Sequence, residues 1–413
     1  MKIEIDKVKG FQDYLPPESQ KRAKVTAVAK QIFELYGFVP IETPIIEYDE
    51  LMRPESLPSE GEDDAVAERF KLQDRGGRNL GLRYEFTFQL SRILKQNPNL
   101  KMPFRRYQIG PVFRDEPIRQ GRVRQFTQCD IDIIGSSELS ADAECLACIS
   151  DVLIALEIKD FQIQLNNRKL LNAIIESVQI QNAKQVMREL DKMQKIGEDE
   201  VKLNLRKYTT PNQIITLLKL LDKPLSFFIE NAFDGAKELQ ELINLCSLYG
   251  LKPIFNPYMI RGFAYYTGGI FEFIKEGKTS IVGGGRYDNT VGKFLNREIP
   301  AVGISFSIEA LMALCPELSE IEIKPQARVL IISINEDKAS ISLAKSLRKK
   351  NISTILTFGQ ISKQLEYANA QKIPYVVFLG EIEVNNNKFK LKDMTSGEEK
   401  QLTEKQLISK LAK

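Results

Sequence analysis

The chain has 413 residues with 43% hydrophobic content, which is enough for two or three domains. Its 58 basic and 55 acidic side chains give a net charge of +3, so there is no overall charge excess that would indicate nucleic-acid binding. It contains no histidine, which excludes Ser–His–Asp and Cys–His catalysis and every histidine-ligated metal site. No apolar run approaches the length of a membrane span, and the N-terminus MKIEIDKVKG is not a signal peptide, so we expect a cytoplasmic protein without a membrane partner.

The first predicted elements are a long helix and a strand. Apolar residues spaced by three and four predict an amphipathic helix over Glu18–Tyr36, and Gly37 would end it. A β-like run follows over Phe38–Thr43. The apolar face of such a helix packs into a core, forms a subunit interface, or does both.

The next stretch is predicted to be a loop, a strand and a helix. Residues 53–79 are rich in charged side chains, which predicts a mobile loop. The run Gly81–Thr87 predicts a strand, and Phe88–Lys95 predicts a helix. Because alternate residues of a strand point the same way, one face of this strand would carry Arg83, Glu85 and Thr87.

A hairpin with a long tip is predicted next. Arg106–Arg114 and Arg122–Ile134 are rich in strand formers, and Asp115–Gly121 between them contains the Pro and Gly of a loop. One face of the second strand is apolar, and the other carries Arg122, Arg124, Phe126, Gln128, Asp130 and Asp132. This polar face is either a solvated surface with ordinary ion pairs, or a site where arginine forks bind phosphate or carboxylate oxygens, a ring stacks on a base and carboxylates bind an amine.

Helical patterns dominate the middle of the chain. Ser137–Ile158 predicts a helix and Phe161–Leu165 a strand, and Arg168–Leu251 is mostly helical. The pair Cys145 and Cys148 lies within the first of these helices, with no second pair elsewhere. We interpret them as core thiols rather than as a zinc or redox site.

The last quarter of the chain predicts a separate α/β domain. Val302–Leu314 predicts a strand that runs into a helix, and Cys315–Ala327 predicts a linker. Beyond it, buried-strand runs at 329–334 and 376–380 alternate with helices, one of them over Asp337–Lys350.

Several of these stretches together resemble the histidyl-tRNA synthetases, a family of class II aminoacyl-tRNA synthetases. GFQDYLP and YGFVPIETPIIE resemble motif 1 and its surroundings, and FRDE followed by RQFTQCDIDIIG, within Phe113–Gly135, resembles motif 2. RGFAYYTGGIFEF and GGGRYDN resemble two signatures of the family, and VGISFSIEALMAL resembles motif 3. KQLEYANAQKIPYVVFLGE resembles the anticodon-binding domain of the same group.

The resemblance implies an α/β fold class: an α+β catalytic domain with an antiparallel sheet in residues 1–325, a helical insertion at about 168–251, and an α/β anticodon-binding domain in 326–413. The implied reaction joins L-histidine to tRNA(His) through a histidyl-adenylate, with ATP and Mg²⁺. Motif 1 implies a homodimer. The helical insertion either contacts the tRNA acceptor or presents ordinary soluble surface.

The resemblance also implies a set of site residues. Arg114 and Arg261 are the expected catalytic arginines, on the α-phosphate and the substrate carboxylate. Histidine is expected to bind at Glu85, Phe86, Thr87, Gln128, Asp132, Tyr265, Tyr266 and Tyr287, with its α-amino group on Glu85, Thr87 and Gln128 and its imidazole at Asp132 and the tyrosines. ATP is expected at Arg114, Glu116, Arg122, Phe126 and Glu309, with adenine on Phe126.

The sequence departs from the family pattern at two positions. Ala310 stands where motif 3 has an arginine expected to hold the γ-phosphate, and Ala264 stands where the family has an aspartate. Either Arg122, Arg124 or a loop lysine replaces the lost cation, or ATP binds weakly. The second case would suit a non-catalytic histidine-sensing relative such as the regulatory subunit of ATP phosphoribosyltransferase, but the C-terminal domain and the retained tyrosine signature favour the ligase.

Overall fold

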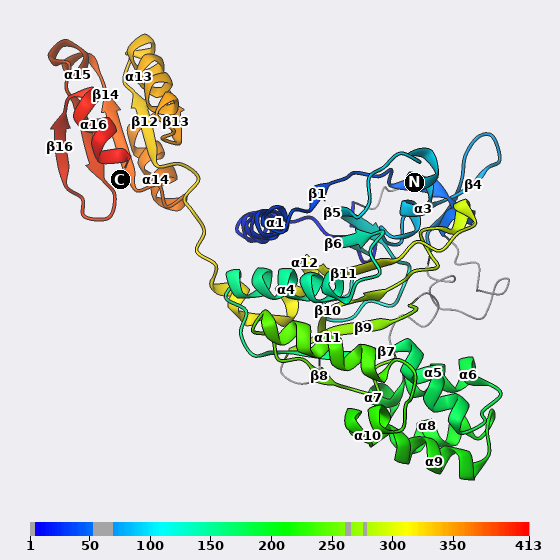
Figure 1. Cartoon of the computed structure of the whole chain (residues 1–413). Coiled ribbons are helices and arrows are strands. Elements are labelled where there is room, and N and C mark those ends of the chain that lie inside the picture. The colour runs from blue at the N-terminus through cyan, green and yellow to red at the C-terminus, as the bar shows by residue number, and fades with distance from the viewer. Residues whose placement is uncertain (1–4, 53–68, 261–265, 276–278, 413) are drawn as a thin grey trace. The chain divides into compact units, whose positions relative to one another are not determined.

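The computed structural model describes residues 5–52, 69–260, 266–275 and 279–412 (Figure 1). The chain divides into two compact units, Met1–Ile321 and Glu322–Lys413. Among the described residues, no helix combines the length and the apolar character needed to cross a membrane.

An eight-stranded sheet forms the centre of the first unit, with the order β1-β5-β6-β11-β10-β9-β7-β8. The predicted antiparallel sheet is confirmed for the inner strands, and the short edge strands β1 and β8 pair in parallel, so the whole sheet is mixed. Its strands are β1 (Val39–Pro40), β5 (Phe104–Phe113), β6 (Gln125–Ile134), β7 (Phe161–Asn167), β8 (Ile254–Phe255), β9 (Gly269–Lys275), β10 (Thr279–Arg286) and β11 (Ala301–Ser307).

One face of this sheet packs against helices. The alternating apolar residues of β6, among them Cys129, Ile131 and Ile133, are buried in one large hydrophobic cluster with Cys145 and Cys148. The prediction that the cysteine pair is core is therefore confirmed. The cluster also includes residues of the helices after β7, and the other helices that contribute to it are α1 (Glu18–Leu35), α4 (Leu139–Ala155), α11 (Ala236–Leu248) and α12 (Ile308–Leu314).

The predicted helical stretch after β7 forms a bundle at one end of the first unit (Figure 1). Strong local signals start its helices: Thr210 caps α9 in a capping box with Gln213, and Pro211 occupies the first turn. Its helices are α5 (Arg168–Ser177), α6 (Ala183–Leu190), α7 (Met193–Ile196), α8 (Glu198–Leu205), α9 (Pro211–Leu221) and α10 (Leu225–Glu230).

A small three-stranded sheet corrects two predictions. It consists of β2 (Ile46–Tyr48), β4 (Asn79–Leu82) and β3 (Lys71–Gln73), so the end of the predicted loop 53–79 is a strand, while residues 53–68 lie outside the described residues. The predicted strand Gly81–Thr87 is too long, since β4 ends at Leu82. The chain turns there because the Glu85 carboxylate accepts hydrogen bonds from the N–H groups of Thr87 and Phe88 and so caps α3 (Phe88–Gln96).

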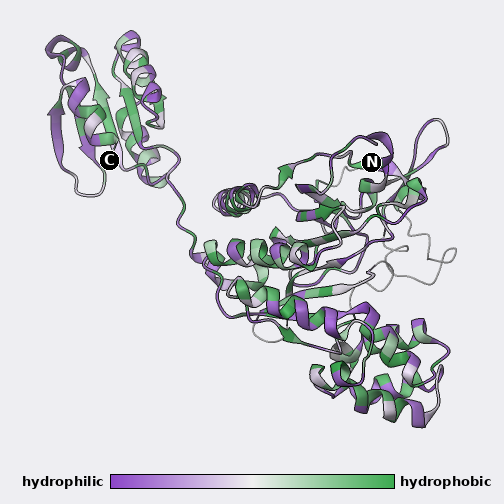
Figure 2. Ribbon diagram, in the orientation of Figure 1, coloured by the Kyte–Doolittle hydropathy of each residue, from purple (hydrophilic) through white to green (hydrophobic). Residues whose placement is uncertain are grey.

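The second unit is a five-stranded sheet with helices, as predicted for an α/β domain. Its order is β13-β12-β14-β15-β16, with the first three strands parallel. In Figure 2 the inner strands are coloured hydrophobic and the edge strand β16 hydrophilic. The elements are β12 (Val329–Ser333), α13 (Asp337–Lys349), β13 (Thr354–Thr357), α14 (Ile361–Ala370), β14 (Tyr375–Leu379), α15 (Glu381–Asn386), β15 (Phe389–Asp393), β16 (Glu399–Leu402) and α16 (Glu404–Leu411).

The predicted linker Cys315–Ala327 is structured in its first half. A short 3-10 helix, η3 (Pro316–Glu320), follows α12, and Leu318 is buried in the core of the first unit. Glu317 accepts a hydrogen bond of 2.6 Å from the buried Lys275. Acidic residues without periodicity predicted a linker, but the ion pair of Glu317 with Lys275, a hydrogen bond of 3.1 Å from the Lys159 N–H to Glu317 and the burial of Leu318 hold the segment.

Candidate functional site

A row of buried polar side chains lies on the second face of the central sheet. Gln128, Asp130 and Asp132 of β6 are 5%, 4% and 2% exposed, so the solvated-surface interpretation of this face is wrong. We call these residues the polar row. In the antiparallel pairings their neighbours on β5 are Gly110, Gln108 and Arg106, and those on β11 are Ser307, Ser305 and Gly303. The small residues of β11 leave room beside the carboxylates.

Arg106 and Tyr287 hold Asp132 at one end of the polar row. The fully buried Arg106 places Nη2 2.6 Å from Asp132 Oδ2, and the Tyr287 hydroxyl donates a short hydrogen bond to Asp132 Oδ1. Burial raises the pKa of Asp132, although Arg106 opposes this. Gly303 is required here, because a Cβ at this position would overlap the Asp132 carboxylate.

Asp130 belongs to the polar row, but the predicted set of site residues does not include it. Gln128 Nε2 donates a hydrogen bond of 3.0 Å to Asp130 Oδ2, while Asp130 Oδ1 has no partner among the described residues. Burial raises the pKa of Asp130 well above its usual value; Arg106 opposes the shift, and the carboxylates of Asp132 and Glu85 increase it. The alternation of β6 already placed Asp130 on the same face as Asp132, and that was the available signal.

The predicted segment Glu85–Thr87 lies against the polar row. Glu85 is 8% exposed, and its oxygens accept hydrogen bonds of 2.5 and 2.6 Å from the N–H groups of Thr87 and Phe88. Burial raises the pKa of Glu85, and these hydrogen bonds oppose the shift. Phe86 is fully buried and packs in a small cluster with Val112 and Phe126.

Arg114 extends the polar row toward the hairpin tip. Its guanidinium carbon lies 4.4 Å from the ring centre of Tyr84 and 5.0 Å from that of Phe126. Its Nη2 is 3.4 Å from Gln128 Oε1. Its Nε also donates a hydrogen bond of 3.4 Å to the Tyr84 carbonyl. A planar guanidinium held in this way is the group that suits a phosphate or carboxylate.

The hairpin tip holds a second set of predicted residues. Glu116 is 9% exposed and accepts a hydrogen bond of 3.3 Å from the largely exposed Arg122. Arg124 forms an ion pair with Asp115 at 3.2 Å. Among the described residues there is no group of three or more Cys, Asp or Glu side chains that could hold a metal ion.

Glu309 is not brought together with the polar row. It accepts hydrogen bonds from Arg22 of α1, at 2.7 Å, and from the Thr127 N–H, at 2.8 Å. Arg22 also lies 3.7 Å from the ring centre of Tyr14. The hairpin tip approaches position 310: a Cβ on Gly121 would lie 3.4 Å from Ala310 Cα.

The tyrosine signature is only partly described. Arg261, Ala264 and Tyr265 lie outside the described residues. Tyr266 packs over Gly285, where a Cβ would lie 2.9 Å from its ring, and it belongs to the same hydrophobic cluster as Tyr287. The two described tyrosines therefore line one wall next to Asp132.

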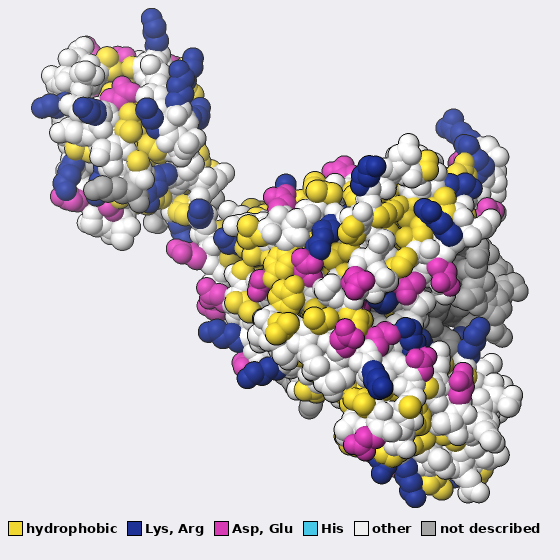
Figure 3. All heavy atoms as spheres, in the orientation of Figure 1, with side chains coloured by type: hydrophobic (Ala, Val, Ile, Leu, Met, Phe, Trp, Pro, Cys, Tyr) yellow, Lys and Arg dark blue, Asp and Glu magenta, His cyan; other side chains and the backbone are white. Residues whose placement is uncertain are grey.

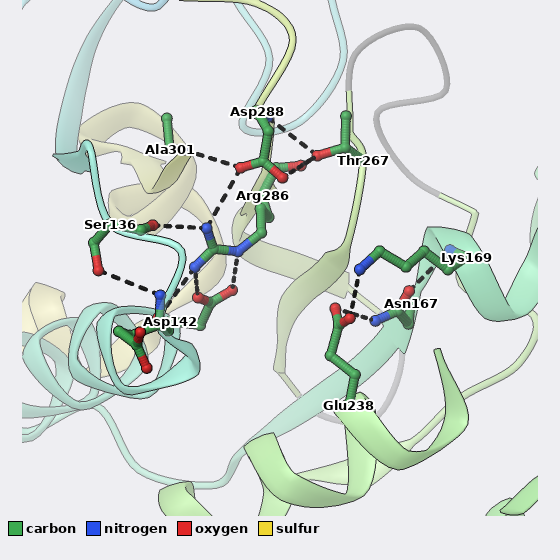
Figure 4. Close-up of polar contacts among 10 residues, drawn as sticks. Ser136, Asp142, Asn167, Lys169, Glu238, Thr267, Arg286, Asp288 and Ala301 are labelled. Atoms are coloured by element: carbon green, nitrogen blue, oxygen red, sulfur yellow. Dashed lines mark hydrogen bonds and ion pairs between the residues drawn. The ribbon is translucent and has the colours of Figure 1, made fainter. Parts of the chain in front are cut away.

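A buried arginine network supports this wall, and it was not predicted (Figure 4). Arg286 forms an ion pair with the fully buried Asp142 and donates hydrogen bonds to the Ser136 and Glu138 carbonyls, at 2.9 and 3.2 Å. Burial raises the pKa of Asp142 to about 6, against the effect of Arg286. Because Arg286 precedes Tyr287, the network fixes the backbone that carries the tyrosine hydroxyl to Asp132.

The arrangement divides into two chemical halves. Buried carboxylates beside Arg106 and Tyr287 suit an ammonium group and a ring N–H, because buried charges require partners. Arg114, between two aromatic rings at the other end, suits a phosphate or carboxylate with a flat group beside it.

Comparisons with known proteins agree over almost the whole chain. Residues 10–311 match the family described as histidyl-tRNA synthetase, and residues 326–413 match the anticodon binding domain. The chain is 38% identical to histidine–tRNA ligase 1 of Bacillus cereus, over 96% of this chain and 95% of that protein. It is 36% identical to the histidine–tRNA ligase of Helicobacter pylori, over 94% and 93%.

Solved structures share the fold. The histidyl-tRNA synthetase of a Nostoc species superposes with a TM-score of 0.84 at 28% identity, covering 99% of both chains. A protein described as an ATP phosphoribosyltransferase regulatory subunit/histidyl-tRNA synthetase, from Bacillus halodurans, superposes with a TM-score of 0.74 over 89% of this chain and 97% of its own. Because this second protein is only 20% identical to the chain, the match shows a similar fold and nothing about function.

Proposed function

The chain belongs to the histidyl-tRNA synthetase family, and from this premise we infer that it is a histidine–tRNA ligase, which joins L-histidine to tRNA(His) at the expense of ATP. The observation that carries the inference is the similarity to ligases over both compact units, including an anticodon-binding domain at 326–413. The histidine-sensing alternative is not favoured, because the curated relatives that cover nearly the full chain are ligases.

The reaction requires stabilisation of charge on phosphate oxygens in both steps. In the first, the histidine carboxylate attacks the α-phosphorus of ATP, and histidyl-adenylate and pyrophosphate form. In the second, a terminal ribose hydroxyl of the tRNA attacks the adenylate carbonyl and AMP leaves. Fixed cations that act where water is excluded stabilise such charge most effectively, which is consistent with a chain that has no histidine side chain.

Histidine is proposed to lie along the polar row. Its imidazole would donate to Asp132 beside Tyr266 and Tyr287, and Tyr265 is proposed for the same pocket. Its α-amino group would lie near Gln128, Glu85 and Thr87. Support comes from the burial of Asp132 and Gln128. Gly285 and Gly303 also support it, because a Cβ at either position would collide with Tyr266 or Asp132. Phe86 is proposed to contribute through its buried cluster with Val112 and Phe126.

ATP is proposed to bind between Arg114 and the hairpin tip. Arg114 would contact the α-phosphate, with Arg261 on the substrate carboxylate, and adenine would stack on Phe126. Glu116 and Arg122 are proposed to lie near the phosphates of ATP and their Mg²⁺ ion. Glu116 is a nearly buried carboxylate, and its only side-chain partner among the described residues is the largely exposed Arg122. A Mg²⁺ ion bound there would neutralise phosphate charge.

Glu309 is proposed to act on ATP only indirectly, because it is not part of the polar row and its carboxylate joins Arg22 of α1 to the Thr127 N–H. It would fix the end of β6 next to Phe126. For the cation missing at position 310, Arg122 is the better candidate than Arg124: its side chain is 58% exposed against 28%, so it has more freedom to reach the triphosphate.

The decisive test is histidine-dependent exchange between ATP and pyrophosphate, followed by charging of tRNA(His). We expect exchange only when L-histidine is present, and aminoacylation when tRNA(His) is added. Histidine binding by calorimetry without exchange, together with no tRNA binding in gel filtration, would instead identify a histidine-sensing relative.

A homodimer is proposed through the strand β2. The burial pattern of β2 is the reverse of the usual one, in which apolar residues are buried and charged residues are exposed. Ile46 and Tyr48 are 49% and 53% exposed, whereas Glu47 between them is buried and forms an ion pair with Arg92 at 2.5 Å. β2 is also an edge strand, and exposed apolar edges are usually covered. Figure 3 shows apolar side chains over one face of the first unit, where they accompany charged ones.

The substitution Ile46→Asp is expected to weaken the dimer by about a hundredfold or more, because it places an unpaired charge in an apolar interface. Sedimentation velocity over a range of concentrations measures this. Leu72→Asp on β3 is the matched control: Leu72 is 41% exposed and lies on the other edge of the same sheet. A dimer that withstands Ile46→Asp would exclude β2 from the interface.

A further inference from the structure

The candidate site contains more buried carboxylates than described cations to pair with them. Glu85, Asp130 and Asp132 are 8%, 4% and 2% exposed. The described charged or titratable groups that interact electrostatically with Asp130 include Arg106 from β5, Asp132 and Cys129 from β6, and Glu85 from the segment before α3. The neighbour on β11 is the uncharged Ser305. With all carboxylates ionised, this set would carry two excess negative charges.

Of these carboxylates, Asp130 alone keeps an oxygen that has neither a hydrogen bond nor an ion pair among the described residues. Both Glu85 oxygens accept backbone N–H groups, Asp132 Oδ1 accepts from Tyr287, and Asp132 Oδ2 has no hydrogen bond but forms an ion pair with Arg106. Gln128 occupies Asp130 Oδ2 and leaves Oδ1 free in a buried position. A buried acceptor with no donor is unfavourable by itself, so a ligand that supplies a donor gains from binding there.

We propose that Asp130 is a further histidine-binding residue, whose Oδ1 accepts a charge-assisted hydrogen bond from the α-ammonium group of the substrate. The proposal rests on the proposed function and refines it. Asp130 lies between Gln128, proposed for the α-amino group, and Asp132, proposed for the imidazole, and all three share one face of β6. A histidine that spans the row passes directly over Asp130.

This contact would couple histidine binding to proton release. In the free protein, burial and the neighbouring carboxylates raise the pKa of Asp130, so the group holds its proton to a higher pH than an ordinary aspartic acid does. The ammonium favours the ionised form and lowers that pKa in the complex. The affinity for histidine should therefore rise with pH in the range between the pKa of Asp130 in the complex and its higher pKa in the free protein. Because the chain has no histidine, no imidazole of the protein contributes in that window.

Calorimetry of L-histidine binding to the full chain tests the proposal. Titrations at several pH values, each in two buffers of different ionisation enthalpy, give the number of protons released. We expect the wild-type protein to release about one proton more per histidine than Asp130→Asn. At the alkaline end of the range the variant should bind histidine roughly tenfold to a hundredfold more weakly, as expected for one lost hydrogen bond to a charged group.

A ligand without the ammonium group provides the measurement that needs no variant. Imidazole-4-propionate retains the ring and the carboxylate of histidine, so the wild-type protein should release the extra proton with histidine and not with this analogue. The effect of Asp130→Asn should likewise disappear with the analogue. Asp160→Asn makes the same chemical change at an exposed position and should change neither quantity.

The outcomes separate this proposal from the proposed function. Equal proton release and equal affinity in the wild type and Asp130→Asn would overturn the role of Asp130, while histidine-dependent exchange could still establish the ligase. Proton release that depends on Asp130 without any exchange would support the contact and contradict the ligase. A wild-type protein that binds no histidine would overturn both.

Discussion

Replacing Arg114 by alanine is expected to lower histidine-dependent ATP–pyrophosphate exchange by about 10²- to 10³-fold, the usual effect of removing one fixed donor from a site of developing charge. The structure holds this guanidinium between the rings of Tyr84 and Phe126, at 4.4 and 5.0 Å, and next to Gln128. The side chain is thus already oriented before a phosphate arrives, which is the condition for strong transition-state stabilisation. The rate constant should fall far more than the affinity for histidine.

Two further variants separate the causes of that loss. Arg114→Lys retains the charge but loses the planar fork that binds two oxygens and stacks on rings, so its activity should be intermediate. Arg78→Gln removes an exposed arginine that forms an ion pair with Asp74 at 2.6 Å, and exchange should not change. If Arg114→Ala retained exchange within about threefold of the wild type, an anion-stabilising role for Arg114 would be wrong.

Arg106→Met should destabilise the first unit by about 3–5 kcal/mol and abolish histidine binding, because it leaves buried carboxylates without their cation. Arg106 is fully buried, and its Nη2 lies 2.6 Å from Asp132 Oδ2. The loss should be greater at higher pH. Without Arg106 the carboxyl pKa values of the folded state rise further above those of the unfolded state, so the unfolded chain releases protons first as pH increases, and the free energy of unfolding falls.

The measurement has to follow this unit by itself, because the chain contains two compact units that can unfold separately. Hydrogen exchange of the β5 and β6 amides in urea, at two pH values, reports the local free energy of unfolding. Arg105→Met is the control from the adjacent position: Arg105 is 30% exposed and pairs with Glu144 at 2.6 Å, so its loss should cost only about 0–1 kcal/mol. Equal losses for the two variants would show that Arg106 has no special electrostatic role.

The sequence was most informative where local rules decide the structure. Alternation along β6 predicted that Gln128, Asp130 and Asp132 share a face opposite Cys129, and the structure confirms it. The hairpin, the long helices and the strand that runs into α12 were predicted for the same reason, since periodicity and turn residues act over a few positions. The family signatures then indicated the chemistry without any knowledge of the tertiary structure.

Partners distant in the chain decided the rest. The Glu309 carboxylate, which stays a predicted ATP contact, accepts a hydrogen bond from Arg22, 287 positions away, and no local pattern predicts that partner. The Asp142–Arg286 network joins residues 144 positions apart, and the sequence around neither residue predicts its partner. The strand predicted over Gly81–Thr87 ends early because Glu85 caps α3 with its carboxylate, a use that strand parity does not predict.

The sequence by itself therefore determined the family, the elements and the face on which the polar residues lie. Only the tertiary structure decided that Gln128, Asp130 and Asp132 are buried and that Arg106 and Tyr287 contact the oxygens of Asp132. It also decided that one oxygen of Asp130 has no partner among the residues that the structure describes. The physical reason is that side-chain direction follows from the backbone period, whereas burial and pairing depend on which distant segments pack over the sheet.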